Sequence, residues 1–236
     1  APRMSYTYTR ICIDLSPQVL HEVLQLAADN LTDLSLVPVP PSNHMYELYQ
    51  YSIATEIALY IARITQPGDL RTELVLAKNH GDEVVGFLQY LPVKGCTDAC
   101  GITYMAVSAR HRRKGVAQGM IALMLETYPH AALSCVIEKV PLYEKLGFQV
   151  IGSRDGQVSM NTRDYVANGV IGTIAVSGLF ETEDALRIRA HLDMKYGRKA
   201  IADAQKKIHR DYTRMVERTK KFVIEYMAKM GKEPVC

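Results

Sequence analysis

The sequence of 236 residues has no long apolar run. Because a bilayer-spanning helix needs about 18 or more consecutive apolar residues, no transmembrane segment is expected. The first residues, APRMSYTYTRICID, also lack the apolar core of a secretory signal peptide. We therefore expect a protein that makes no contact with a membrane.

Cysteine is scarce, and its arrangement excludes two common uses. The five cysteines are Cys12, Cys96, Cys100, Cys135 and Cys236, an odd and scattered set that suits a reducing cytosol better than a disulfide framework. Cys96 and Cys100 have no second Cys or His pair at ligand spacing, so no metal site is expected. The sequence thus predicts a cytoplasmic protein without a structural metal.

Charge is divided unevenly along the chain, although the net charge is only +3. Residues 1–160 hold 13 Lys and Arg against 15 Asp and Glu, whereas residues 161–236 hold 15 against 10. The apolar share of 48% is that of an ordinary globular protein. The length allows one large domain or a domain with an appendage, and the change of charge favours two units.

The apolar periodicity of residues 6–161 predicts an α/β layout without internal repeats. Ser16 and Pro17 form a typical helix start, 34–43 is proline-rich, and 154–156 has the composition of a hairpin turn. The expected strands are 6–14, 73–78, 84–93, 101–107, 133–137, 148–153 and 158–161, and the expected helices are 19–30, 44–64, 116–127 and 141–146.

The last third of the chain has a different pattern. Residues 170–179 are consistent with an extra strand or a buried connection, and 182–194 with a helix capped by Thr182. Residues 198–230 form a long helical pattern with apolar residues near heptad spacing and many basic residues between them. That helix is expected to pack on its own domain or to form a homodimer, with contact to nucleic acid as the weaker alternative.

The most informative segment is 102–117, ITYMAVSARHRRKGVA, an apolar strand followed by a basic loop and a helix. The first N–H groups of a helix have no partner within it, and the helix dipole adds positive charge there. Gly115 allows close approach of a ligand, and Arg112, Arg113 and Lys114 add full charges. This pattern predicts an anion site of the kind that binds pyrophosphate.

A second motif, LYEKLGF, follows the basic loop at residues 142–148. With both motifs in order, residues 8–162 resemble the GCN5-related N-acetyltransferase (GNAT) superfamily. The resemblance implies a mixed, mostly antiparallel sheet flanked by helices. We expect a GNAT domain at 1–162 and a basic helical extension at 163–236 for docking or dimerisation.

The resemblance also implies site residues and a co-substrate. Acetyl-CoA would lie along the strand end, with the backbone N–H of Met105 at the thioester carbonyl and that of Val107 at the pantetheine arm. Tyr143 would protonate the leaving thiolate as general acid. The residues implied in cofactor binding are Met105, Ala106, Val107, Arg112, Arg113, Lys114, Gly115, Val116, Ala117 and Gln118.

Other residues near the second motif are expected to be structural. Leu142, Leu146 and Phe148 are assigned to the core, and Gly147 to a left-handed helix C-cap.

The general base has no clear candidate in the sequence. Some members of the superfamily carry a Glu at the position that is Gly101 here. The nearby alternatives are His44, Glu47, Glu56, Asp98 and Glu138, and proton removal through ordered water is favoured over all of them.

The expected function is transfer of an acetyl group from acetyl-CoA to a primary amine by direct attack in a ternary complex. The acceptor, a small molecule or a protein amine, is expected between residues 31–45 and the hairpin at 154–156. That region lacks the acidic wall that a polycationic acceptor requires. The alternatives are an acyltransferase acting on a tRNA or DNA base, and a non-catalytic acyl-CoA-binding module.

Overall fold

The computed structural model describes residues 5–68 and 70–233, so Cys236, one of the predicted free cysteines, lies outside the described residues. The strands are β1 (Thr7–Ile11), β2 (Glu73–Lys78), β3 (Val84–Pro92), β4 (Ala99–Val107), β5 (His130–Cys135), β6 (Gln149–Arg154) and β7 (Gln157–Asn161). The helices are α1 (Pro17–Asp29), α2 (Leu31–Leu34), α3 (Tyr46–Ala62), α4 (Val116–Thr127), α5 (Val140–Lys145), α6 (Glu183–Tyr196) and α7 (Arg198–Lys229), with short 3₁₀ turns η1 (Ala109–His111), η2 (Ile137–Lys139) and η3 (Ser177–Phe180).

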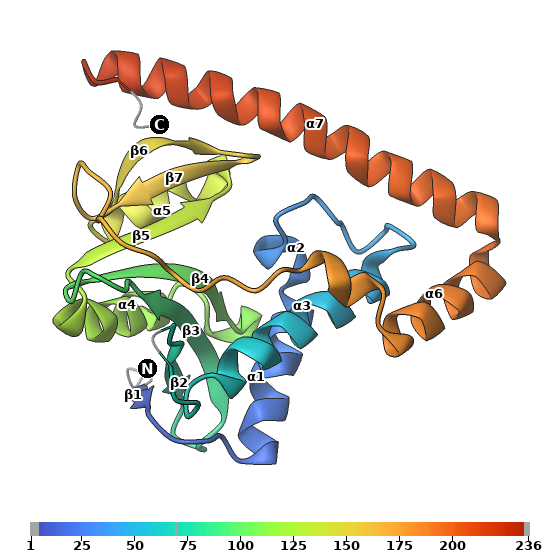
Figure 1. Cartoon of the computed structure of the whole chain (residues 1–236), viewed down its shortest axis with the longest axis horizontal. Coiled ribbons are helices and arrows are strands. Elements are labelled where there is room, and N and C mark those ends of the chain that lie inside the picture. The colour runs from blue at the N-terminus through green and yellow to red at the C-terminus, as the bar shows by residue number, and fades with distance from the viewer. Residues whose placement is uncertain (1–4, 69, 234–236) are drawn as a thin grey trace.

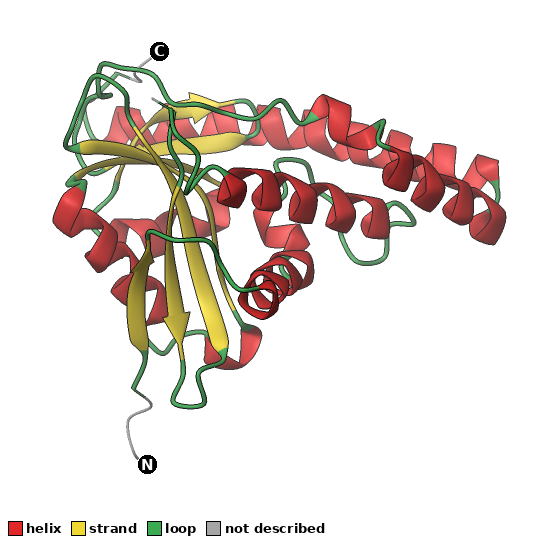
Figure 2. Ribbon diagram, turned by 60° about the horizontal axis from the view of Figure 1, so that its bottom comes forward, coloured by secondary structure: helices red, strands yellow, loops and turns green. Residues whose placement is uncertain are grey.

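The strands form one seven-stranded sheet in the order β1-β2-β3-β4-β5-β7-β6. Every neighbouring pair is antiparallel except β4 and β5, which are parallel. Helices lie on both faces of the sheet (Figure 2). The predicted fold class, a mixed and mostly antiparallel sheet flanked by helices with a helical C-terminal extension, is confirmed.

Two apolar clusters fill the two faces of the sheet. One joins α1, α3 and the start of α7 to one face and includes Tyr104 and Ala106 of β4. The other joins α4, α5 and the end of α7 and includes Val107 and, partly buried, Met105. Because side chains alternate along a strand, neighbouring residues of β4 belong to opposite faces.

Local signals placed most helix ends correctly. Ser16 accepts a hydrogen bond from the Val19 N–H at the start of α1, and Thr182 accepts one from Ala185 at the start of α6. The tight hairpin between β6 and β7 turns at Asp155, whose φ is 53°. Boundaries differ from the prediction by a few residues, and the short helix α2 was not predicted.

Residues 170–179 do not form the extra strand that was one of two predictions. Val170 makes a single bridge with Lys94, and the segment then runs without regular structure to η3. Side chains of α3 bind its backbone, since the Ile174 N–H donates to the Tyr60 hydroxyl and Arg63 donates to the Gly172 carbonyl. These contacts replace a strand partner and leave a partly exposed connection.

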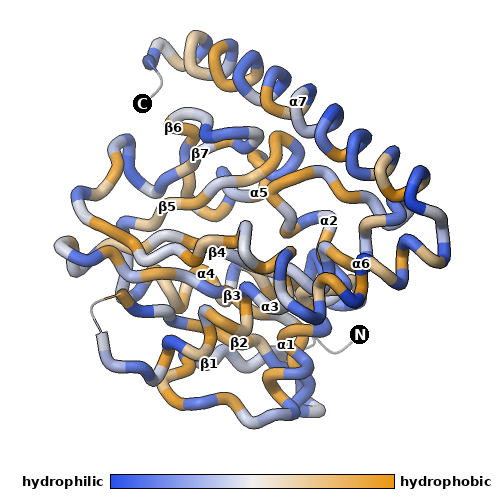
Figure 3. The backbone as a smooth tube through the Cα atoms, turned by 45° about the vertical axis from the view of Figure 1, so that its right-hand side comes forward, coloured by the Kyte–Doolittle hydropathy of each residue, from blue (hydrophilic) through white to orange (hydrophobic). Residues whose placement is uncertain are grey.

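The 32-residue helix α7 lies across the sheet edge formed by β6 and then continues to α6 (Figure 1). Its hydrophobic and hydrophilic residues alternate along the tube in Figure 3, and its buried residues include Ile208, Val223 and Met227. Covering an edge strand removes a site for unwanted strand pairing. Among the described helices, none combines the length and apolar character needed to cross a membrane.

Candidate active site

The two parallel strands at the centre of the sheet separate after a short contact. Residues Ala99–Gly101 of β4 pair with β5, but β5 then pairs only with β7, whereas β4 stays with β3 as far as Val107. Thr103 is an extra residue in β4, because Gln89 is opposite Tyr104 and Tyr90 is opposite Ile102. Such a bulge bends a strand and increases its local twist.

The separation exposes backbone groups on one edge of β4. The Ser108 N–H donates to the Val85 carbonyl of β3, N to O 2.8 Å. Since N–H groups alternate sides along a strand, Ala106 also faces β3, and the N–H groups of Met105 and Val107 face the edge that β5 leaves. The two predicted backbone donors therefore lie on the same free edge.

The basic loop has the backbone conformation of an anion cradle. Gly115 is the N-cap of α4 with φ 84° and ψ 5°, and Arg113 is also left-handed with φ 60°. No atom lies within 4 Å of the place where a Cβ on Gly115 would stand, and no side chain caps the helix. The N–H groups of Val116, Ala117 and Gln118 open α4 and lack partners within the helix.

The basic side chains of this loop differ in their surroundings. Lys114 donates to the Arg110 carbonyl, and Arg113 is exposed. Arg112 donates to the Val107 carbonyl, Nε to O 3.3 Å, and its guanidinium also contacts Asn30 and Asp33. Arg112 therefore already has partners on the α1–α2 side of the molecule.

Tyr143 lies on α5, close to the end of β5. Its ring packs edge-on against Phe148, with 6.0 Å between centroids, and only 8% of the residue is exposed. Burial, with smaller contributions from Cys135 and Asp33, raises the pKa of Tyr143 well above its ordinary value. The hydroxyl is thus protonated at neutral pH, as a proton donor must be.

The turn after Tyr143 keeps this short helix in place. Gly147 has φ 95°, its N–H donates to the Glu144 carbonyl, and the Phe148 N–H donates to the Tyr143 carbonyl. This is the double hydrogen bond of a left-handed helix C-cap, as predicted. Phe148 is buried as predicted, but Leu142 is 43% exposed, because it lies on the outer side of the single-turn helix.

Asp33 was not among the predicted site residues, and it lies across the gap between the separated strands. Its carboxylate contacts Arg112, which follows β4, at 3.3 Å and Lys139, which follows β5, at 3.7 Å. No sequence signal pointed to Asp33, since an Asp in a four-residue helix resembles any surface acid. The tertiary structure brings it within electrostatic range of Tyr143.

Four of the five candidate general bases from the sequence are either exposed or in contact with other side chains. His44 stacks on Tyr196, and Glu47 is exposed at the start of α3. Glu138 forms an ion pair with Arg218. A backbone hydrogen bond and, to a smaller extent, this ion pair lower the pKa of Glu138. Asp98 is described in the next paragraph.

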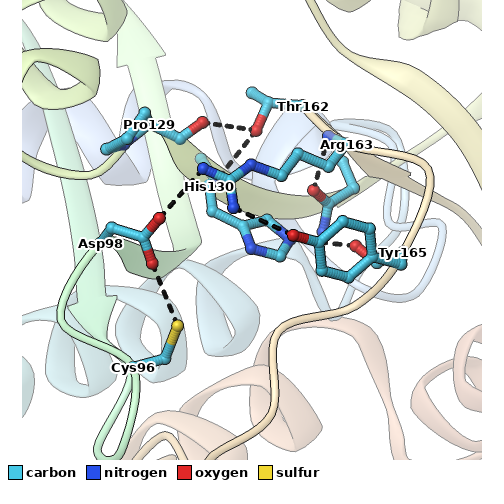
Figure 4. Close-up of polar contacts among 9 residues, drawn as sticks. Cys96, Asp98, Pro129, His130, Thr162, Arg163 and Tyr165 are labelled. Atoms are coloured by element: carbon cyan, nitrogen blue, oxygen red, sulfur yellow. Dashed lines mark hydrogen bonds and ion pairs between the residues drawn. The ribbon is translucent and has the colours of Figure 1, made fainter.

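Asp98 belongs to a polar cluster that fixes the chain after β7 (Figure 4). It accepts hydrogen bonds from Cys96 and Arg163, and Arg163 also donates to the Tyr165 hydroxyl. His130 contacts the Tyr165 carbonyl at 2.9 Å. The cluster joins the starts of β4 and β5 to the chain after β7, whereas the basic loop follows the end of β4, so we assign the cluster a structural role.

Glu56 is buried on α3 and faces β4. It accepts a hydrogen bond from Tyr104, the residue before Met105. Burial raises the pKa of Glu56, which the bond from Tyr104 partly opposes.

The structure also has a pocket away from the candidate active site. A pocket of about 480 Å³ between β1, the start of α1 and the β2–β3 turn contains none of the predicted site residues. Within residues 5–68 and 70–233, no three His, Cys, Asp or Glu side chains are grouped as metal ligands.

Comparison with known proteins identifies the family. Residues 71–150 match the family model described as an acetyltransferase (GNAT) domain. No curated protein matches the chain.

One solved structure shares the fold at low sequence identity, and a second is more distantly similar. One is the PaiA N-acetyltransferase from Thermoplasma acidophilum in complex with coenzyme A, which is 12% identical with a TM-score of 0.53. That match covers 68% of this chain and 99% of the other. Escherichia coli ElaA is 17% identical with a TM-score of 0.43, over 67% of this chain and 100% of the other.

The matched region runs from β2 to β6 and includes the β4 edge, the basic loop and Tyr143. The family model and the shared fold lead to one conclusion: residues 71–150 belong to the acetyltransferase (GNAT) domain family, within a chain that has the fold of a GNAT acetyltransferase.

Proposed function

We propose that the protein is an acetyl-CoA-dependent N-acetyltransferase that transfers the acetyl group directly to a primary amine. One observation carries the proposal: β4 and β5 separate at Gly101, which leaves the Met105 and Val107 N–H groups free beside the start of α4. A pantetheine arm bonds to such an edge like an added strand. The coenzyme A in the PaiA structure supports the same choice of donor.

Different residues around the β4 edge bind different parts of acetyl-CoA. The N–H groups of Val116, Ala117 and Gln118 and the open space at Gly115 receive the pyrophosphate, with Arg113 and Lys114 adding positive charge. The Val107 N–H binds the arm, and the Met105 N–H donates to the thioester carbonyl. As negative charge develops on that oxygen, this bond strengthens, and such a donor contributes roughly 3 kcal/mol.

The chemistry forms one C–N bond and breaks one C–S bond. The neutral amine attacks the carbonyl carbon, the electron pair of the C–S bond leaves on sulfur, and Tyr143 gives its proton to that thiolate. The proton lost by the amine passes to ordered water, and Tyr143 regains a proton from water before the next turnover.

Cys135, close to Tyr143, is an unsuitable nucleophile. Burial raises the pKa of its thiol to about 12, so it stays protonated. Transfer by direct attack in a ternary complex therefore agrees better with these surroundings than a covalent acyl-enzyme.

The alternatives have less support. Several basic side chains of α7 form ion pairs within the chain, among them Lys207 with Asp211 and Arg218 with Glu138. These pairs reduce the positive charge that a nucleic-acid surface requires. A non-catalytic acyl-CoA-binding module would not need the buried, protonated Tyr143. A homodimer through α7 and a domain boundary at residue 162 stay predictions.

The test is turnover with purified full-length chain. Release of free coenzyme A thiol is followed with acetyl-CoA and a panel of primary amines, and the acetylated product is identified by mass spectrometry. Reactions without the chain correct for spontaneous acetylation. Saturable release with at least one amine is expected, whereas a folded chain that releases no coenzyme A with any amine would overturn the proposal.

A further inference from the structure

Helix α7 is attached to both sides of the region where the amine is expected. The Asn43 side chain, in the loop before α3, donates to the Ala204 carbonyl of α7, Nδ2 to O 3.1 Å. Thr219 of α7 donates to the Gly156 carbonyl in the β6–β7 hairpin, Oγ1 to O 2.9 Å. Asn43 and Thr219 are both buried. These are fixed contacts rather than a loose association.

A second pair of contacts joins α7 to the segment that carries Tyr143. Arg218 forms an ion pair with Glu138 at 2.7 Å, and the Tyr226 hydroxyl donates to Glu144 at 2.7 Å. Glu138 precedes α5 and Glu144 lies within it. The helix is therefore held against the loop before α3, the hairpin and α5 at the same time.

A long stretch of α7 separates the first two contacts. Ala204 and Thr219 are 15 residues apart, which corresponds to about 22 Å of helix. Figures 1 and 3 both show α7 passing from the β6–β7 side to α6, with α2 and the loop after it on its inner side. Residues 204–219 of α7 are called the acceptor wall below.

The inner face of the acceptor wall is largely apolar, with Asp211 as a half-buried acid beside Tyr212. Ile208 is buried, and Tyr212 and Met215 are half-buried. A Cβ on Gly156 would contact both Met215 and Tyr212, so these side chains lie against the hairpin turn. The cations Lys206, Arg210 and Arg214 are exposed on the outer face.

The acceptor wall lies on the side from which an amine would approach. The proposed pyrophosphate site is at the start of α4, which covers one face of the sheet, the face of Met105 and Val107. The amine must reach the thioester carbonyl from the side that acetyl-CoA does not occupy. That side is the face of the sheet covered by α1, α2 and α3. The first half of α7, with Ile201, Ala204 and Ile208, belongs to the cluster on that face.

We propose that the acceptor wall selects a small primary amine with an apolar body. This inference rests on the proposed function. To present a lysine here, a folded protein would have to fit past α7, which is attached both to the loop before α3 and to the β6–β7 hairpin. A polyamine would find only the half-buried carboxylate of Asp211, which is already paired with Lys207 and Arg214, whereas Tyr212 and Met215 offer apolar contact.

The test compares three acceptors with the full-length chain: phenethylamine, spermidine and native cytochrome c. We expect the highest kcat/KM with phenethylamine and no acetylated cytochrome c. Tyr212→Ala should lower the phenethylamine-to-spermidine ratio of kcat/KM by roughly 3- to 10-fold, because an aromatic contact is lost. The acetyl-CoA KM should not change, and Arg210→Ala, on the outer face, should keep the ratio of the unmodified chain.

Two results would overturn the acceptor wall: cytochrome c acetylated as efficiently as phenethylamine, or an unchanged ratio in a folded Tyr212→Ala variant. If circular dichroism shows that this variant does not fold, Met215→Ala carries the same comparison. Failure of the proposed function looks different, because no amine would then release coenzyme A. Release with an unchanged ratio contradicts only the acceptor wall.

Discussion

The hydroxyl of Tyr104 donates a hydrogen bond to the carboxylate of Glu56, with 2.6 Å between Oη and Oε2. The pair joins β4 to α3 directly beside Met105, and both residues are buried. Burial raises the pKa of Glu56, so the Glu56 carboxyl binds a proton more strongly in the folded chain than in the unfolded chain. The bond thus fixes the strand that carries the proposed thioester donor.

This raised pKa predicts a pH-dependent stability. The stabilising effect of protonated Glu56 is complete below the pKa of the unfolded chain and is lost as pH rises through the higher folded pKa. Glu56→Gln cannot lose a proton, so it should gain stability relative to the unmodified chain as pH rises from 4 to 8. Free energies of unfolding in urea measure the difference, and parallel pH curves for the two proteins would contradict it.

Tyr143→Phe should lower kcat by roughly 10²- to 10⁴-fold, the usual contribution of a positioned general acid. The ring stays packed against Phe148, so acetyl-CoA affinity should hardly change. Steady-state kinetics and calorimetry separate the two quantities. Tyr165→Phe, on an exposed tyrosine in the structural cluster, is the control, and equal kcat values for the two variants would argue against a role as acid.

Gly115→Glu should abolish acetyl-CoA binding, because it puts a carboxylate where the pyrophosphate is expected. Gly197→Glu is a matched control: Gly197 is the N-cap of α7, has φ 88° against 84°, and has equally open space around it. Both variants add one carboxylate at an open N-cap with positive φ, and the backbone strain is greater at Gly197, where ψ is 145° against 5° at Gly115. Calorimetry with the two proteins should show loss only for Gly115→Glu, and equal loss would indicate a general effect on folding.

Asp33→Asn should bind acetyl-CoA more tightly, by roughly 2- to 5-fold, the scale of a partly exposed ion pair. The carboxylate now competes with phosphate for Arg112 and Lys139, and the neutral amide would release both cations. Titrations at low and high salt measure the gain, which screening should reduce. Weaker binding by this variant would mean that Asp33 orders the loop rather than competing for its cations.

Thr219→Val should destabilise the chain by about 1–3 kcal/mol, because the Gly156 carbonyl loses a buried partner. Thr213→Val on the same helix is the control, since Thr213 is exposed and bonds only to the His209 carbonyl of its own helix. Urea unfolding compares the two. A similar, small loss in both would show that α7 is not firmly held at the hairpin.

Much of the fold was predictable because its signals are local. Ser16 and Thr182 cap their helices as predicted, and Gly147 ends α5 in the left-handed conformation that its sequence indicated. The strand–loop–helix pattern around Gly115, together with the LYEKLGF motif at 142–148, indicated the resemblance to the GNAT superfamily and the fold class that it implies. Each of these features depends on a few consecutive residues, whose backbone preferences hold in any surroundings.

Other features depended on partners far away in the chain. Residues 170–179 had the composition of a strand, yet Tyr60 and Arg63 of α3 hold them as an irregular connection. Leu142 resembled a core residue but lies on the outer side of α5. Asp33 gave no signal at all, because its role depends on two cations that follow different strands.

By itself, then, the sequence determined most of the elements, the glycine turn that opens α4 and the resemblance to the GNAT superfamily, since hydrophobic periodicity and turn chemistry act over short distances. Only the tertiary structure decided that β4 and β5 separate, that Asp33 lies between Arg112 and Lys139, and that α7 crosses from Asn43 to Gly156. These relationships join residues up to 161 positions apart. They depend on the packing of complete helices and strands, which no single segment encodes.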